Sequence, residues 1–171
     1  MFKRYKLTDI PNIKNRAVFF DANVIIYLFW ATYSNDYNSN RYASIFKKLL
    51  ENKNSLLINL SVLSEVINRV LRIEWEKITG KCINFKQFRK SDNGLQVQED
   101  IFNIIKNKIL KTFHLTDEKI VLDDIKKLLI TDDLDFTDKI IFHVCKTGNI
   151  VLLTHDADFS NADIDILSAN E

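Results

Sequence analysis

The sequence predicts an α/β domain with a largely parallel central sheet. Short, continuously apolar runs such as AVFF (17–20) and IVLLT (150–154) alternate with longer segments of helical periodicity. Continuous apolar runs are typical of strands that are buried on both faces, as in parallel sheets. The 171 residues contain no internal repeat and no Pro/Gly-rich linker, so we expect a single domain over 1–171.

The first half of the chain predicts two strands separated by helices. In order, the patterns indicate a strand at 17–20, a helix at 23–30, a polar loop at 33–40, a helix at 41–51 and a strand at 56–60. Ser61 follows as a candidate N-cap, because its hydroxyl can accept a hydrogen bond from a first-turn backbone N–H. We expect the helix that it opens to run to about Trp75.

The second half returns to this alternation after a basic, irregular stretch at 78–94. The later patterns indicate an amphipathic helix at 96–110, a short strand at 113–115, a helix at 118–129 and a short edge strand at 163–167. Thr137 can cap a further helix, which Gly148 closes before the strand at 150–154.

Composition excludes several classes of protein. Apolar residues make up 46% and charged residues 27%, which is ordinary for a folded domain. Cys82 and Cys145 are too few for a disulfide framework or a zinc site and read as reduced thiols. The longest apolar stretch, at 17–31, is too short to span a bilayer, and the N-terminus lacks the apolar run of a secretory signal. We therefore expect a cytoplasmic location.

Charge is segregated along the chain, although the formal net charge is only +1. Seven Lys/Arg residues lie between Arg69 and Lys90, and nine acids lie between Asp132 and Glu171. Neutrality by itself gives no nucleic-acid signal, but such segregation can place an acidic pocket beside a basic rim. Solvated charge on unrelated faces explains the pattern equally well.

Four acids stand at unusual positions. Asp21 and Asp156 follow apolar strands, where the carboxyl edge of a parallel sheet binds ligands. Asp138 falls within the apolar arc of its helix, and an unpaired inward carboxylate costs roughly several kcal/mol unless it is neutralised or bound to a cation. Each aspartate is also a good helix cap, which is the alternative. Glu65 begins a polar stripe with Arg69 and Arg72, which suits either a surface ion pair or an acidic cleft with phosphate contacts.

These four carboxylates together predict a metal-dependent phosphodiesterase. Carboxylate oxygens are ligands for hard cations such as Mg²⁺ or Mn²⁺. Clustered carboxylates repel and raise one another's pKa values, so a bound cation resolves the conflict. One or two such ions can activate a water for in-line hydrolysis of a phosphodiester.

The segments that carry these acids resemble, in order and spacing, the four motif blocks of PIN domains. The blocks are FFDANVIIYLF (19–29), SVLSEVINRV (61–70), LDFTDKIIFHVC (134–145) and IVLLTHDADF (150–159). The resemblance implies a three-layer α/β/α sandwich and an Mg²⁺- or Mn²⁺-dependent nuclease, most often acting on RNA. It also implies metal-binding and catalytic roles for Asp21, Glu65, Asp138 and Asp156.

The resemblance extends to neighbouring residues and to partners. Asn23 and Thr154 stand where PIN domains often place an amide or a hydroxyl near the metal. Small bacterial PIN domains are commonly VapC-like toxins of type II toxin–antitoxin pairs, so we expect a homodimer and an antitoxin partner. Two departures bear on this: an extended helical segment around 76–112, and Asp158 as an alternative fourth acid to Asp156.

Two other functions remain open at this point. A haloacid-dehalogenase-like phosphatase would use Asp21 as a nucleophile, but it needs a second Asp where this chain has Asn23. A catalytically silent PIN-like scaffold that binds RNA or protein is the other alternative, and the intact acidic set argues against it.

Overall fold

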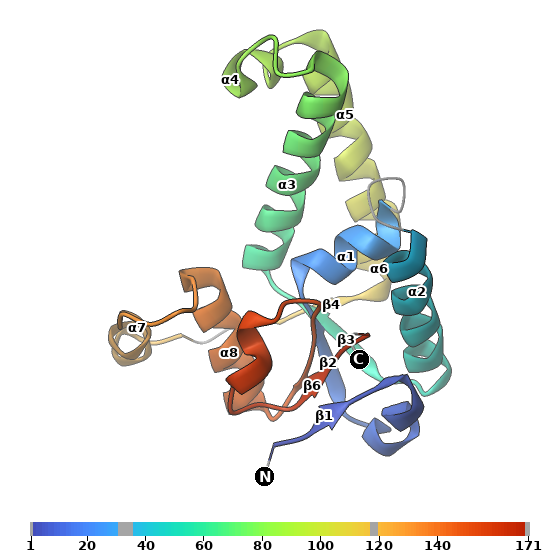
Figure 1. Ribbon diagram of the computed structural model, residues 1–171, viewed down its shortest axis with the longest axis vertical. Helices are drawn as coiled ribbons and strands as arrows, with labels where there is room; N and C mark the ends of the chain where they lie inside the picture. The colour runs from blue at the N-terminus through green and yellow to red at the C-terminus, as the bar shows by residue number, and fades with distance from the viewer. Residues whose placement is uncertain (1, 31–35, 117–119, 170–171) are drawn as a thin grey trace.

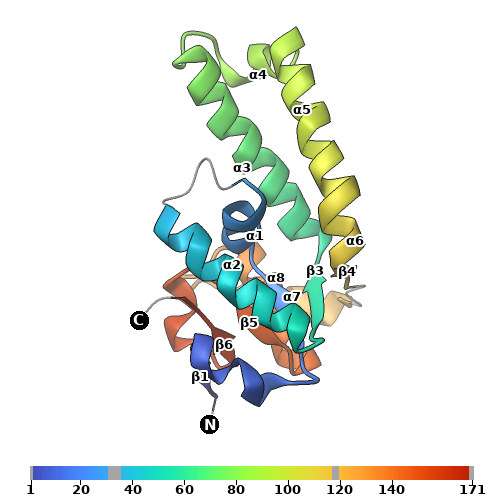
Figure 2. The ribbon, with the colours of Figure 1, turned by 90° about the vertical axis from the view of Figure 1, so that its right-hand side faces the viewer.

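The computed structural model describes residues 2–30, 36–116 and 120–169, and its centre is a six-stranded sheet (Figures 1 and 2). The strand order is β1-β6-β5-β2-β3-β4, and every pairing is parallel. The strands are β1 (Arg4–Tyr5), β2 (Ala17–Phe20), β3 (Ser55–Ile58), β4 (His114–Leu115), β5 (Val151–Leu153) and β6 (Ile166–Leu167). The predicted α/β class with a parallel sheet is confirmed.

Helices cover both faces of this sheet. The chain steps from β2 to β3 through α1 (Ala22–Phe29) and α2 (Asp36–Glu51), and from β3 towards β4 through α3 (Leu60–Thr79). It returns from β4 to β5 through α7 (Leu122–Leu128) and α8 (Phe136–Gly148). Because right-handed crossovers in opposite directions cover opposite faces, a three-layer sandwich results. Figure 1 shows the sheet between α2 and α8.

The two central strands explain the apolar runs of the sequence. Val18, Phe19 and Phe20 of β2 have no exposed surface, and the same holds for all three residues of β5. The ring of Phe20 packs edge-on against that of Phe113, with centroids 4.9 Å apart. The site residues that follow β2 and β5 are therefore attached to fully buried strands.

The strand predicted at 163–167 exists as β6, but its predicted position at the edge of the sheet is wrong. β6 lies between β5 and β1, and β1 forms the edge instead. The guanidinium group of Arg4 strengthens this edge by donating to the carbonyls of Ile164 at 2.7 Å and Ala162 at 2.8 Å. β1 was not predicted, because Arg4–Tyr5 lies in a basic stretch of the sequence with no apolar run to indicate a strand. The 3-10 helix η1 (Leu7–Ile13) that follows it was not predicted either.

Both predicted N-caps are wrong by two residues. Asn59 caps α3 in place of Ser61, and its side chain accepts from the N–H of Val62 at 2.8 Å. Asp135 caps α8 in place of Thr137. In each case a side chain two positions earlier reaches the free N–H groups of the first turn, which the apolar periodicity alone does not locate.

Helix α2 is longer than predicted. It begins at Asp36, so residues 36–40 of the expected loop are helical, and 31–35 lie outside the described residues. Tyr42, Ile45 and Leu49 are fully buried on one face of this helix, and their packing extends it into a polar sequence. Helix α7 is shorter than the predicted 118–129, of which 118 and 119 lie outside the described residues.

The predicted irregular stretch at 78–94 is also wrong, because most of it is helical. α3 continues to Thr79 and ends at Gly80 in the left-handed conformation, with φ 55°. Then follow α4 (Phe85–Phe88), α5 (Asp92–Ile104), a π-helical turn η3 (Ile105–Ile109) and α6 (Leu110–Thr112). A capping box between Asn84 and Gln87 opens α4.

α3 and α5 lie side by side and extend away from the sheet, with α4 at their far end (Figures 1 and 2). We call α3, α4 and α5 the arm. Trp75 joins its parts, because its indole N–H donates to the carbonyl of Ile83 at 2.8 Å. Within the described residues, no helix is both long and apolar enough to cross a membrane.

Candidate active site

Asp21 lies at the carboxyl end of β2, at the start of α1. Its backbone is extended, with φ −71° and ψ 154°, and its N–H donates to the carbonyl of Leu153 in β5 at 3.1 Å. Its side chain makes no cap hydrogen bond; instead, its Oδ2 accepts from Oγ1 of Thr154 at 2.7 Å. Asp21 is 4% exposed. Its buried carboxylate is therefore hydrogen-bonded to the residue that follows the neighbouring strand β5.

Thr154 connects two of the candidate acids. Its hydroxyl donates to Asp21 and also accepts from the N–H of Asp156 at 2.9 Å. Its carbonyl accepts from the hydroxyl of Tyr42 at 3.0 Å. Thr154 is 1% exposed, so its buried hydroxyl links the carboxylate of Asp21 to the backbone of Asp156.

The pKa values of two acids are raised strongly. Burial raises the pKa of Asp21 to about 6, the Thr154 hydrogen bond opposes this shift, and the charges of Glu65 and Asp156 add to it. Burial also raises the pKa of Asp138 to about 7, with further contributions from Asp135 and then from Asp21, Asp156 and Glu65. The four predicted acids therefore act on one another electrostatically, although they come from four separate segments.

Asp156 and Asp158 have different surroundings. Asp156 is half-buried and contributes to the raised pKa values of Asp21 and Asp138. Asp158 is exposed and lines a separate cavity of about 410 Å³. Its N–H donates to Oδ1 of Asp156 at 3.0 Å, so the backbone of Asp158 orients Asp156.

Glu65 forms the ion pair that its spacing from Arg69 allows. Its Oε1 lies 3.1 Å from the Nη1 of Arg69, and the two side chains are 32% and 45% exposed. Arg72, three residues further along α3, places its guanidinium carbon 4.4 Å from the ring centroid of Phe85. Of the two predicted phosphate contacts, Arg69 therefore lies beside the acids and Arg72 lies towards the far end of the arm.

Two residues near the acids received no role from the sequence. Asp135 accepts from the N–H of Asp138 at 2.9 Å, and its charge helps to raise the pKa of Asp138. Its position three residues before Asp138 is the capping signal that could have located it. His155 lies beside Thr154, with its Nδ1 at 3.1 Å from the hydroxyl of Tyr42. Asn23 is half-buried in the first turn of α1.

The donor chemistry of this site fits a hard divalent cation. Its side chains offer carboxylate oxygens and no sulfur, and their repulsion is what a cation relieves. Among residues 2–30, 36–116 and 120–169, however, no three His, Cys, Asp or Glu side chains already lie close enough to share one ion. Binding would therefore draw the carboxylates together, and the ion pair of Glu65 with Arg69 is one contact that would have to change.

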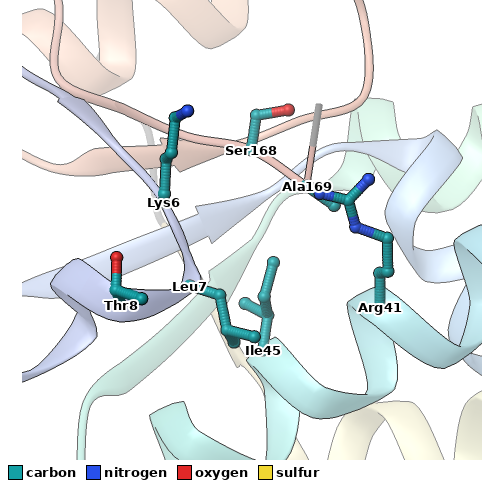
Figure 3. Close-up of a pocket in the computed structure, with 7 residues that line it drawn as sticks. All are labelled: Lys6, Leu7, Thr8, Arg41, Ile45, Ser168 and Ala169. Carbon is teal, nitrogen blue, oxygen red and sulfur yellow. The ribbon is translucent and has the colours of Figure 1, made fainter. Parts of the chain in front are cut away.

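A different kind of cavity lies near the ends of β1 and β6 (Figure 3). Its volume is about 260 Å³. Lys6 and Arg41 stand on opposite sides of it, and Ser168 and Thr8 add hydroxyl groups. Because no carboxylate lines it, this cavity is distinct from the acidic site.

A family model described as the PIN domain matches residues 18–165, a range that includes all four acids. The chain belongs to the PIN-domain family. No curated protein matches the sequence of this PIN domain closely enough to add to that assignment.

Three solved structures share the fold of this PIN domain at low sequence identity. PAE2754 from Pyrobaculum aerophilum is 15% identical with a TM-score of 0.51, and the alignment covers 90% of this chain and 84% of that one. VapBC2 from Rickettsia felis, bound to a DNA fragment from its promoter, is 16% identical with a TM-score of 0.51, covering 89% and 98%. FitAcB from Neisseria gonorrhoeae is 15% identical with a TM-score of 0.54, covering 88% and 96%.

Proposed function

We propose that this PIN domain is an endoribonuclease that hydrolyses phosphodiester bonds in RNA with Mg²⁺ or Mn²⁺. The observation that carries the proposal is the coupling of four carboxylates at one edge of the sheet, where the pKa values of two are raised to about 6 and about 7. A cation bound beside these carboxylates would favour the ionised forms of Asp21 and Asp138 and relieve the repulsion that raises their pKa values. Asp21, Glu65, Asp138 and Asp156 would hold that cation.

The surrounding residues orient these ligands. A bound ion of this kind lowers the pKa of a water and offsets negative charge on the phosphate. The Thr154 hydroxyl fixes the rotation of Asp21, and the Asp135 cap fixes the first turn of α8 that carries Asp138. Arg69 neutralises Glu65 in the metal-free protein. If Glu65 bound the ion instead, Arg69 would be available to contact an RNA phosphate at the rim of the site.

Metal dependence and the acidic set are tested by one assay. Labelled RNA is incubated with the protein in EDTA, Mg²⁺ or Mn²⁺, and with the variants Asp138→Asn and Asp158→Asn. We expect cleavage only with a divalent ion, a loss of at least about a hundredfold for Asp138→Asn, and near-parent activity for Asp158→Asn. Cleavage in EDTA, or equal loss in both variants, would contradict the proposal. Tight RNA binding without cleavage under any condition would indicate a binding scaffold.

We further infer that the protein is the toxin of a type II toxin–antitoxin pair. The fold that it shares with the VapBC2 and FitAcB structures supports this. The proposal includes an antitoxin partner, a homodimer, a cytoplasmic location and one nuclease domain over 1–171, in which the 76–112 segment includes the far end of the arm and returns to the sheet through α6. Expression in a bacterial host should arrest growth, and Asp138→Asn should relieve the arrest. Continued growth with abundant active enzyme would contradict the toxin assignment.

A further inference from the structure

The far end of the arm carries a basic groove, which lies apart from the four acids. Its volume is about 490 Å³. The residues that line it are Phe85, Lys86, Arg89, Lys90, Leu95 and Gln98. Three of these side chains are cationic and none is a carboxylate, so the groove is complementary to an anion.

Two arginines hold their guanidinium groups against one aromatic ring beside this groove. The guanidinium carbon of Arg72 lies 4.4 Å from the ring centroid of Phe85, and that of Arg89 lies 6.0 Å from it. Within the part of the chain that the structure describes, neither guanidinium donates a hydrogen bond or forms an ion pair. Stacking occupies the flat face of a guanidinium and leaves its N–H donors free for a phosphate.

The frame that carries these cations is rigid. Trp75 packs edge-on against Phe85, with ring centroids 5.7 Å apart, and donates to the carbonyl of Ile83. Phe88 of α4 is 1% exposed, so α4 contributes a buried side chain to the packing of the arm. A fixed frame lowers the entropy lost when a ligand binds. The backbone of the groove is therefore held by packed aromatic side chains, and the exposed cations Lys86, Arg89 and Lys90 project from it.

We propose that this groove, with Arg72 at its side, binds the phosphate backbone of a single-stranded segment of the RNA substrate. The inference rests on the proposed ribonuclease function and adds a second contact point to it. Along α3, Arg72 lies seven residues beyond Glu65, about 10 Å at 1.5 Å per residue, and its guanidinium contacts the groove residue Phe85. Because the groove lies beyond Arg72, we expect a dinucleotide at the acids not to reach it, whereas a strand of several nucleotides reaches both.

The test compares two triple variants that each lose three positive charges, one variant at the groove and the other at the opposite end of α5. Lys86→Ala/Arg89→Ala/Lys90→Ala removes the cations of the groove. The matched control, Lys106→Ala/Lys108→Ala/Lys111→Ala, removes three exposed lysines from η3 and α6, at the other end of α5. Binding of a labelled oligouridylate is measured by fluorescence anisotropy in EDTA at several salt concentrations, and thermal unfolding confirms that each variant is folded.

We expect the groove variant to bind about tenfold or more weakly at low salt. The slope of log K against log salt should shrink by about 2, because each lost single-strand phosphate contact removes about 0.7. The control should keep nearly the affinity and slope of the parent. Equal weakening in both variants would show that net charge alone matters and would overturn the proposal. Unchanged binding by the groove variant would also overturn it and would favour an acidic protein partner.

Cleavage assays separate this inference from the proposed function. With Mn²⁺, the groove variant should cleave a dinucleotide at the parent rate and a long RNA with a raised KM. A parent that cleaves RNA, together with a groove variant that binds and cleaves long RNA equally well, would overturn the inference and leave the nuclease function standing. If the parent cleaves no RNA, and the groove variant binds RNA more weakly than the parent, the nuclease function is overturned and the groove is supported.

Discussion

At the scale of single residues, Asp21 shows how the sheet edge changes the chemistry of a carboxylate. It is almost fully buried, and its carboxylate accepts a hydrogen bond from the Thr154 hydroxyl at 2.7 Å. A hydroxyl stabilises a buried charge less than a cation does. Burial therefore raises the pKa of Asp21 to about 6. Without a cation, the ionised form of this residue weakens the folded state.

Asp21→Asn separates function from stability. We expect it to abolish RNA cleavage, because a charged ligand is lost, while the melting temperature in EDTA stays equal or rises. The reason is that a neutral amide can accept the Thr154 hydrogen bond without the cost of a buried charge. Cleavage and thermal unfolding are measured on the same preparations, with the exposed Asp158→Asn as control. A large drop in melting temperature would mean that the carboxylate is mainly structural.

The raised pKa values also set the sign of a pH dependence. In the folded, metal-free protein, Asp21 and Asp138 keep their protons to about pH 6 and about pH 7, whereas the ordinary pKa of an aspartate is 3.8. Between about pH 4 and pH 7 the folded state thus binds more protons, so its free energy of unfolding falls as the pH rises. The two-unit shift of Asp21 corresponds to on the order of 2–3 kcal/mol.

Denaturant unfolding in EDTA across this range tests the sign. The parent should lose stability from pH 5 to pH 8, and Asp21→Asn/Asp138→Asn should lose clearly less, because neither amide titrates. A parent whose stability rises over the same interval would show that these carboxylates are stabilised in their charged form.

At the scale of elements, the arm depends on close packing where α4 meets α5. Gly94 lies in the first turn of α5, and a Cβ at this position would stand 1.9 Å from the carbonyl oxygen of Phe88. Such an approach requires the backbone to move. The close packing of α4 against α5 therefore requires glycine at this position. The basic groove depends on the same packing, because residues of both helices line it.

Gly94→Ala should loosen the end of the arm. We expect it to lower stability by about 1–3 kcal/mol, as overpacking does, and to increase amide hydrogen exchange in α4 and the first turns of α5. Gly80→Asn is the control, since Gly80 has φ 55° with nothing within 4 Å of its built Cβ, and Asn tolerates that conformation. Unchanged exchange around α4 in Gly94→Ala would show that the chain absorbs the methyl group without loss of order.

At the scale of the whole molecule, metal binding and folding are linked. The candidate ligands follow β2, β3 and β5 or begin α8, so they come together only when the sheet has formed. A cation held by all of them binds the folded state and not the unfolded one. Its binding free energy then adds to the stability of the entire chain.

Mn²⁺ should therefore raise the melting temperature in a concentration-dependent way. At a hundredfold excess over its Kd, the expected stabilisation is about 2.7 kcal/mol. The effect should weaken as the pH falls below 7, because Asp138 must release its proton to bind. Thermal unfolding is compared between the parent and Asp138→Asn, with Ca²⁺ as a second ion. The same rise in melting temperature in the parent and in Asp138→Asn would show that the ion binds away from Asp138.

The sequence by itself determined the parallel sheet and the family, and it singled out four candidate acids. The strands at 17–20 and 150–154 are buried on both faces, so their composition reports their environment directly. Asp21 and Asp156 could be assigned to the carboxyl edge because each follows such a strand. Helical periodicity, which repeats within a few residues, singled out Asp138, whereas Glu65 was assigned to the site by the resemblance to PIN domains. All of these signals are local in the chain.

Only the tertiary structure decided how those residues are connected. The hydrogen bond from Thr154 to Asp21 joins residues 133 positions apart, and the raised pKa values arise from burial and from charges on separate segments. The position of β1 at the sheet edge and the contact of Arg72 with Phe85 likewise depend on packing between distant parts of the chain. Periodicity in one segment carries no information about which other segment it will meet, because that choice depends on the packing of the whole molecule.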